Sequence, residues 1–197
     1  MKWFKAFLTG TFILFMLIKI AVAQEKNYSL SDYLATINGT SNIKDWNEKV
    51  EKITGWGSVA QHVDKSYILQ SFKMIMQVKS MKSDQGAIFD SRTYKTLKAE
   101  KFPEITFLLT EPVTNIPCNT VGYTVNAKGC LTIAGVTRYL TLPIKISLEG
   151  DKKIMVDGAQ QVKMTDYGIE PPKALFGLLT TGNVITISFK TVFLANN

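Results

Sequence analysis

Residues 131–148 read LTIAGVTRYLTLPIKISL, and apolar side chains alternate with polar ones along most of this stretch. Leu131 and Ile133 are apolar at odd positions, whereas from 140 to 148 the apolar residues stand at even positions. An alternation with a period of two is typical of a strand that turns one face toward an apolar interior. Gly135 stands where the parity changes, so we expect a bulge or sharp bend that redirects the strand, as barrel walls often require.

The first residues have the pattern of a cleavable signal peptide over residues 1–23. Lys2 and Lys5 form a positive start, residues 6–18 are uncharged and mostly apolar, and Ala21-Val22-Ala23 fits a small-residue cleavage site. The alternative is a membrane-spanning helix, which needs about 20 apolar residues and therefore more than this run offers. We expect the chain to be exported, and this pattern leaves the periplasm and full secretion as alternatives. No cysteine stands beside the cleavage site, which argues against a lipid anchor.

Length and composition limit what the exported part can be. Residues 24–197 are long enough for one domain with a sizeable core. The whole chain has 23 Lys and Arg against 16 Asp and Glu. Without the three lysines of the signal peptide, 20 basic residues face 16 acidic ones, a net charge of +4. This charge is spread along the chain and forms no basic stripe, so we expect no nucleic-acid partner.

Cys118 and Cys130 would reach a compartment that permits disulfides if the chain is exported. One extended strand from Thr120 to Ile133 would hold their Cα atoms beyond the roughly 7 Å that a disulfide can span. A bend near Gly129 would bring them closer. We therefore favour two separate thiols and leave the disulfide open.

Period-two patterns and turn residues divide the chain into about eight strands. Residues 67–81 are the clearest example, because Phe72, Met74, Met76 and Val78 share one face. The other expected strand segments are 28–41, 46–63, 105–109, 120–133, 140–148, 154–164 and 185–193.

Two segments are predicted to be helical. Residues 87–99 contain neither Pro nor Gly, follow candidate N-cap residues and end before Pro103, which prevents continuation. Pro171 and Pro172 precede a second short helix, expected over residues 173–178.

These elements predict a mainly β protein, a single extended eight-stranded antiparallel barrel with one or two short helices. A barrel of this size holds one small ligand if its own side chains do not fill the interior. Met74, Met76 and Met164 fit both a packed core and an adaptable lining for a flexible apolar guest. Whether the interior is hollow or filled stays open at this point.

Residues for common catalytic and metal sites are scarce. His62 is the only histidine, and no flanking motif supports a nucleophilic triad. Ligand spacings for a metal and glycine-rich phosphate loops are both missing from the sequence. Asp166 and Glu170 could form an acid/base pair, but they stand in a turn-like segment with Gly168, and we interpret them as turn residues.

Four blocks of the sequence resemble the YceI-like family. They stand in the expected order and cover the chain from about Tyr28 to Phe193. The blocks are GTSNIKDW at 39–46, LKAEKFPEI at 97–105, LTIAGVTR at 131–138, and MTDYGI at 164–169 followed by Pro171 and Pro172.

The resemblance implies an extended lipocalin-like barrel that bacteria export to the periplasm and that holds a polyisoprenoid chain in a long apolar cavity. Lys44 and Ala134 stand where many relatives carry histidine. Any polar contact that those histidines make with a ligand head group is therefore not carried over to this chain.

We predict a non-enzymatic carrier or reservoir for a polyisoprenoid such as an isoprenoid quinone or alcohol, without catalytic residues, a metal or another cofactor. Transient membrane contact is expected, and a homodimer stays open. The alternatives are a barrel with a filled core that serves as a stress-related or protein-interaction module, and a cyclase or isomerase using Asp166, Tyr167 or Glu170. The residues predicted to line the ligand cavity are Phe72, Met74, Met76, Val78, Phe107, Leu109, Leu131, Ile133, Leu142, Ile144, Ile146, Ile185, Ile187 and Phe189.

Overall fold

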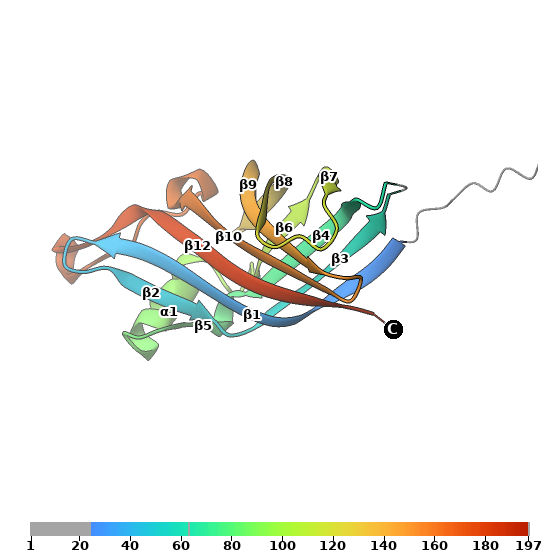
Figure 1. The fold of residues 1–197 in the computed structure, drawn as a ribbon. Helices are drawn as coiled ribbons and strands as arrows, with labels where there is room; N and C mark the ends of the chain where they lie inside the picture. The colour runs from blue at the N-terminus through green and yellow to red at the C-terminus, as the bar shows by residue number, and fades with distance from the viewer. Residues whose placement is uncertain (1–24, 63, 197) are drawn as a thin grey trace, which may run out of the picture.

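The computed structural model describes residues 25–62 and 64–196, so the predicted signal peptide lies outside the described residues. The described chain forms an elongated antiparallel β-barrel with a helix against one end (Figure 1). The barrel closes because the last strand, β12 (Leu179–Ala195), pairs with the first, β1 (Glu25–Ser41). The predicted mainly β, eight-stranded antiparallel barrel is confirmed.

The ring of eight strands runs β1, β3, β4, β6, β8, β9, β10 and β12, and every neighbouring pair is antiparallel. β1 and β12 have 17 residues each. At about 3.3 Å per residue such a strand is about 55 Å long, which makes the barrel elongated. The other strands of the ring are β3 (Ile53–Gln61), β4 (Tyr67–Gln77), β6 (Glu104–Leu109), β8 (Tyr123–Ile133), β9 (Val136–Glu149) and β10 (Lys153–Lys163).

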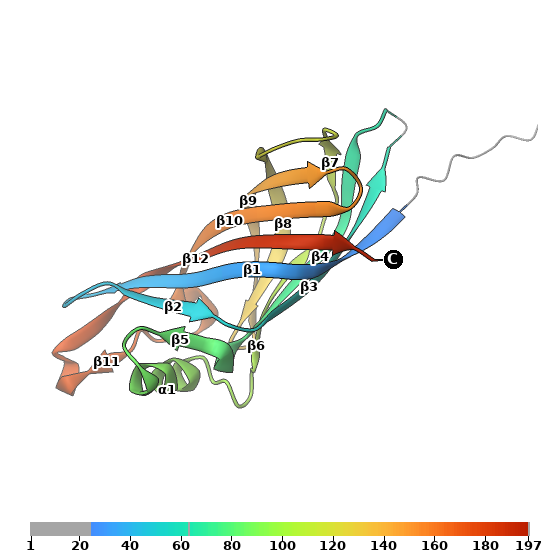
Figure 2. The same cartoon turned by 60° about the horizontal axis from the view of Figure 1, so that its bottom comes forward.

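Short elements extend the ring at one end. β2 (Trp46–Val50) pairs with both β1 and β5 (Met81–Ser83), and β11 (Lys173–Ala174) pairs with the start of β12. Figure 2 shows these strands gathered near α1 (Ala87–Thr96) at the end where β1 turns into β2. The remaining elements are β7 (Val113–Ile116), which pairs with β4, and the 3-10 turns η1 (Val78–Ser80), η2 (Met164–Tyr167) and η3 (Leu175–Gly177).

The parity change in the sequence marks a tight hairpin between β8 and β9. Ile133 pairs with Val136, and the two residues between them, Ala134 and Gly135, have positive φ angles of 48° and 81°. Two consecutive left-handed residues form the turn type whose twist matches antiparallel strands. Because odd-numbered residues of β8 pair with even-numbered residues of β9, both sets face the same interior. The predicted bulge within one strand is therefore wrong.

The first predicted helix is present but shorter. α1 ends at Thr96 instead of residue 99, because Lys98 takes a left-handed φ of 55°. The N–H of Ala99 then donates to the carbonyl of Tyr94, which satisfies a carbonyl at the helix end.

The second predicted helix, over residues 173–178, is wrong. β11 pairs with Leu179 and Thr180, so this segment is a hairpin with η3 at its tip. The expected strand over residues 46–63 is divided into β2 and β3. Cys118 is exposed, Cys130 lies in β8, and both are free thiols, as the favoured alternative predicted.

Bulky side chains fill the barrel at the end opposite α1, which we call the closed end. The hydroxyl of Tyr28 donates to the carbonyl of Asp151 across this end, at 2.9 Å. Lys26 forms an ion pair with the side chain of the same aspartate. The buried side chains here include Tyr28, Ile116, Ile146, Leu148, Ile154, Val156 and Phe193. The closed end is therefore packed core.

Candidate ligand cavity

Two adjoining chambers occupy the rest of the interior, and Ile105 and Ile187 line both of them. The central chamber has a cavity volume of about 30 Å³. The helix-side chamber is larger, with a cavity volume of about 110 Å³. Both volumes are below the roughly 300–1,000 Å³ of most ligand pockets, but above the roughly 10–15 Å³ that one water molecule needs. The protein's own side chains therefore do not fill the interior at this end completely.

The central chamber is almost completely apolar. Inward-facing residues of β4, β6, β8, β9 and β12 supply its wall, and the amide of Gln160 on β10 is its polar member. The lining residues are Phe72, Met74, Met76, Ile105, Phe107, Leu131, Leu140, Leu142, Gln160, Ile187 and Phe189.

Two phenylalanine rings lie close to glycines in the wall of this chamber. A Cβ atom added to Gly129 would lie 2.4 Å from the Phe107 ring, and one added to Gly158 would lie 2.6 Å from the Phe189 ring. Any larger residue at these glycines would push a ring toward the chamber axis. The glycines therefore keep space open in the barrel.

The structure places most of the predicted lining residues around the chambers. Phe72, Met74, Met76, Phe107, Leu131, Leu142, Ile187 and Phe189 line the central chamber, and Ile133, Ile185 and Ile187 line the helix-side chamber.

Four predicted lining residues are buried without lining either chamber. Leu109, Ile144 and Ile146 lie toward the closed end, and Val78 lies in η1, next to α1. Their inward direction follows from the alternation, whereas their position along the barrel depends on register, which the alternation does not give. The role of the lining residues in holding a ligand stays a prediction.

The helix-side chamber opens between α1 and β11, which lie on the same side of the barrel in Figure 2. Among its lining residues, Arg92 of α1 and Lys173 of β11 are the exposed ones, and we call the opening between them the mouth. Trp46 forms part of the wall, and its ring lies 5.7 Å from the Phe89 ring. The same indole covers Gly39, where an added Cβ would lie 2.1 Å from it.

A buried carboxyl group, that of Glu48, belongs to the wall of the helix-side chamber. Glu48 is 1% exposed, and Thr93 of α1 donates a hydrogen bond to its Oε1 atom. Burial raises the pKa of Glu48 to about 7, against the lowering effect of the Thr93 bond and with a further increase from the charge of Asp90. The carboxyl group is therefore partly protonated at neutral pH.

This polar part of the chamber was not predicted from the sequence. In β2, Trp46, Glu48 and Val50 share one parity, so the alternation itself points Glu48 inward among apolar residues. The inward position of Glu48 in this alternation is the sequence feature that could have identified it as a lining residue. No comparable pattern identifies Thr93 or Arg92, because α1 has no continuous apolar stripe.

The residues weighed as catalytic candidates do not gather in the chambers. Asp166 and Glu170 are exposed, and Arg138 donates to the carbonyl of Asp166 at 2.8 Å. Tyr167 is buried and lines the helix-side chamber, and burial raises its pKa. His62 is exposed and lies 3.2 Å from Asp64.

Within residues 25–62 and 64–196, no group of three or more His, Cys, Asp or Glu side chains is arranged to hold a metal ion. In the same part of the chain, no helix is long and apolar enough to cross a membrane.

The closed antiparallel ring and its apolar chambers define a lipocalin-like barrel of the kind that encloses small apolar molecules. The family model for the YceI-like domain matches residues 28–193, and the chain belongs to the YceI-like family. A comparison with curated proteins found no match.

Two solved structures support the fold. The crystal structure of Burkholderia cenocepacia BcnA is 18% identical, with a TM-score of 0.61 over 81% of this chain and 95% of that one. A domain from Saccharophagus degradans, described as polyisoprenoid-binding and implicated in plant cell wall breakdown, is 11% identical. Its TM-score is 0.67 over 88% of this chain and 100% of that domain.

Proposed function

We propose that the protein binds one long-chain polyisoprenoid lipid, such as an isoprenoid quinone or alcohol, in the two chambers. It would act as a non-enzymatic carrier or reservoir in the periplasm. The observation that carries this proposal is the apolar space inside the barrel, closed at one end and open between α1 and β11. The fold shared with the Saccharophagus degradans domain supports the same class of ligand.

The energetics favour a long guest over a short one. Each buried methylene-sized group contributes about 0.8 kcal/mol, whereas association costs about 4–15 kcal/mol. A guest of about ten such groups would therefore gain roughly 8 kcal/mol and bind poorly. A prenyl chain that fills both chambers buries many more groups and needs few polar contacts.

The two chambers differ in polarity, and this difference would orient a bound lipid. The central chamber offers an apolar chain almost no polar group, whereas the helix-side chamber offers Glu48, Thr93 and the cations at the mouth. A lipid would therefore place its tail toward the closed end and its head group toward α1.

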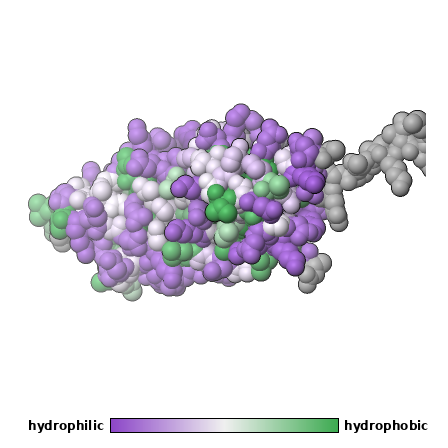
Figure 3. Space-filling model, viewed as in Figure 1, coloured by the Kyte–Doolittle hydropathy of each residue, from purple (hydrophilic) through white to green (hydrophobic). Residues whose placement is uncertain are grey.

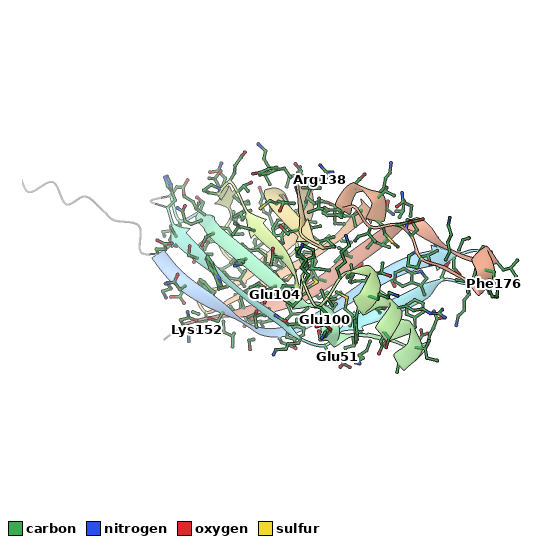
Figure 4. The ribbon with its side chains drawn as sticks, turned by 180° about the vertical axis from the view of Figure 1, so that it is seen from behind. Glu51, Glu100, Glu104, Arg138, Lys152 and Phe176 are labelled. Carbon is green, nitrogen blue, oxygen red and sulfur yellow. The ribbon has the colours of Figure 1, made fainter. Side chains whose placement is uncertain are left out.

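Four exposed apolar side chains lie on the elements at the α1 end of the barrel, and we call them the tip patch: Ile43, Ile88, Phe176 and Leu178. Asn42 donates to the carbonyl of Leu178 at 2.7 Å, so the β1–β2 and β11–β12 hairpins are joined here. Figure 3 shows apolar residues at this tip, and Figure 4 shows Phe176 at its extremity, away from the barrel wall. With Lys44, Arg92 and Lys173 nearby, the tip suits transient contact with a phospholipid surface during loading.

The test combines lipid identification with a matched pair of variants. The exported protein is purified, its native mass is measured, and solvent extracts are analysed for prenyl lipids. Extraction of a prenyl lipid from the wild type, or uptake of added phylloquinone, is the expected result.

Leu131→Trp fills the central chamber, because Leu131 is buried and lines it. Leu108→Trp is the control, because Leu108 lies outward on the neighbouring strand β6 and is 40% exposed. We expect Leu131→Trp to lose most of the lipid and Leu108→Trp to retain it. A wild-type protein that yields no lipid and takes up no prenyl compound would contradict the proposed function.

A further inference from the structure

Glu48 is held in a position where its carboxyl group can form a hydrogen bond with a ligand in the chamber. Its strand, β2, lies between β1 and β5, with Glu48 paired to Ile37 on one side and Ser83 on the other. The side chain is almost fully buried and lines the helix-side chamber. Thr93 donates to Oε1, and among the described residues no hydrogen bond reaches Oε2. One carboxyl oxygen is thus left for a partner in the chamber.

The charged groups around Glu48 do not neutralise it. Asp90 of α1 is the nearest acidic group, and it accepts bonds from Lys82 and from the backbone N–H of Ser83. Arg92 and Lys173 are exposed at the mouth.

The remaining titratable groups here are tyrosines. Tyr167 of η2 lines the same chamber, and its pKa is raised by burial. Tyr94 of α1 donates to the carbonyl of Met81. Among these groups, none forms an ion pair with Glu48.

We propose that Glu48, positioned by Thr93, is a polar subsite that donates a hydrogen bond from its protonated carboxyl group to an uncharged acceptor oxygen on the head of the guest. A quinone carbonyl is the chemical class that fits best, since it accepts but does not donate. This inference rests on the proposed function and narrows it to a neutral head group. An anionic head group at this position would meet the negative charge of Glu48 and Asp90 instead of a donor.

The subsite makes binding depend on pH. Since burial raises the pKa of Glu48 to about 7, the donor form dominates at pH 6 and is largely lost at pH 8. The affinity for a guest with an acceptor oxygen falls by about tenfold over this interval, because one proton governs the bond. A guest without a polar head should show no such dependence.

The experiment measures binding of phylloquinone and of squalene, each delivered from cyclodextrin to the delipidated full-length exported protein, at pH 6 and pH 8. Phylloquinone has a quinone head group with two ring carbonyls and a prenyl-derived tail. Squalene is a prenyl hydrocarbon without a head group. We expect phylloquinone affinity to fall by about tenfold and squalene affinity to stay constant.

Two variants assign the effect to Glu48. Glu48→Gln keeps a donor that does not titrate, so its phylloquinone affinity should be equal at both pH values and exceed that of the wild type at pH 8. Glu51→Gln is the control, since Glu51 lies just after β2 and is exposed, as Figure 4 shows. This control should keep the wild-type pH dependence.

The outcomes separate the inference from the proposed function. Wild-type binding of phylloquinone that does not change with pH overturns the Glu48 subsite and leaves lipid binding intact. An equal pH dependence for squalene also overturns it, because Glu48 would then act through the structure of the chamber. Failure of both probes to bind at either pH contradicts the proposed function itself.

Discussion

Replacement of Glu48 by Gln should change how the stability of the empty protein depends on pH. In the folded chain, burial raises the pKa of this carboxyl group from its ordinary value of 4.5 to about 7. A folded state that binds the proton more tightly than the unfolded chain is relatively most stable at low pH. The stabilising effect is fully present below pH 4.5 and is lost as the pH rises through 7. Ionisation of the buried group then opposes folding.

The size of the effect follows from the two pKa values. Each pH unit between 4.5 and about 7 corresponds to about 1.4 kcal/mol, so the full cost of ionising Glu48 is about 3 kcal/mol. Between pH 5 and pH 8, linkage gives a loss of about 2.5 kcal/mol that arises from this group alone. Glutamine has nearly the same shape, can still accept the bond from Thr93, and carries no charge at either pH.

Urea unfolding of the lipid-free protein at pH 5 and pH 8 measures this difference. From pH 5 to pH 8, we expect the unfolding free energy of Glu48→Gln to rise by about 2.5 kcal/mol relative to that of the wild type. All other titrating groups are common to both proteins, so their effects cancel in this comparison. Glu51→Gln provides the matched control, and its unfolding free energy should follow that of the wild type. If the wild type and Glu48→Gln change in parallel between the two pH values, the buried-carboxyl reasoning is refuted.

Three further substitutions test other parts of the structure. Ile146→Ala at the closed end should lower the free energy of unfolding by about 2–5 kcal/mol and leave the uptake of added phylloquinone as in the wild type; lost uptake at unchanged stability would contradict the packed closed end. Gly135→Val should lower the melting temperature more than Gly150→Val: both glycines have positive φ, but only at Gly135 would the new side chain also meet the ring of Phe102. Replacing Phe176 and Leu178 together by Ser should reduce co-sedimentation with phospholipid vesicles without a change in stability; unchanged sedimentation would exclude the tip patch from membrane contact.

The alternation of residues was sufficient to predict the barrel, because a period of two fixes which side chains face inward whatever the order of the strands. It did not distinguish a bend from a hairpin at Gly135, since a two-residue turn produces the same change of parity. Asn-Gly would have signalled the hairpin, whereas Ala134 gives no such indication. The segment at 173–178 was misread because prolines precede hairpins as well as helices.

The sequence predicted which side chains of the site face inward, but not where they lie along the barrel axis. Inward-facing residues could be named strand by strand, and all of the predicted lining residues face the interior. Their position along the barrel depends on pairing between distant strands, which separated Phe107 in the chamber from Leu109 near the closed end. The helix contribution could not be predicted, because Thr93 and Phe89 reach the chamber through the docking of α1.

The two ends of the barrel differ in the kind of contact that holds them. Strand pairing around the ring is continuous, so opening the wall would break a ladder of backbone hydrogen bonds together with apolar packing. α1 is attached differently: Asp90 is its fully buried residue, Tyr94 donates to a carbonyl of β5, and Thr93 donates to Glu48. Its apolar contacts come from partly buried side chains such as Phe89 and Tyr94, whereas Ile88 is 75% exposed. An element held by a few polar bonds and partly buried side chains separates at a lower free-energy cost than a strand in a closed ring. Access to the chambers is therefore easiest at α1, the end where Glu48 would meet the head of the guest.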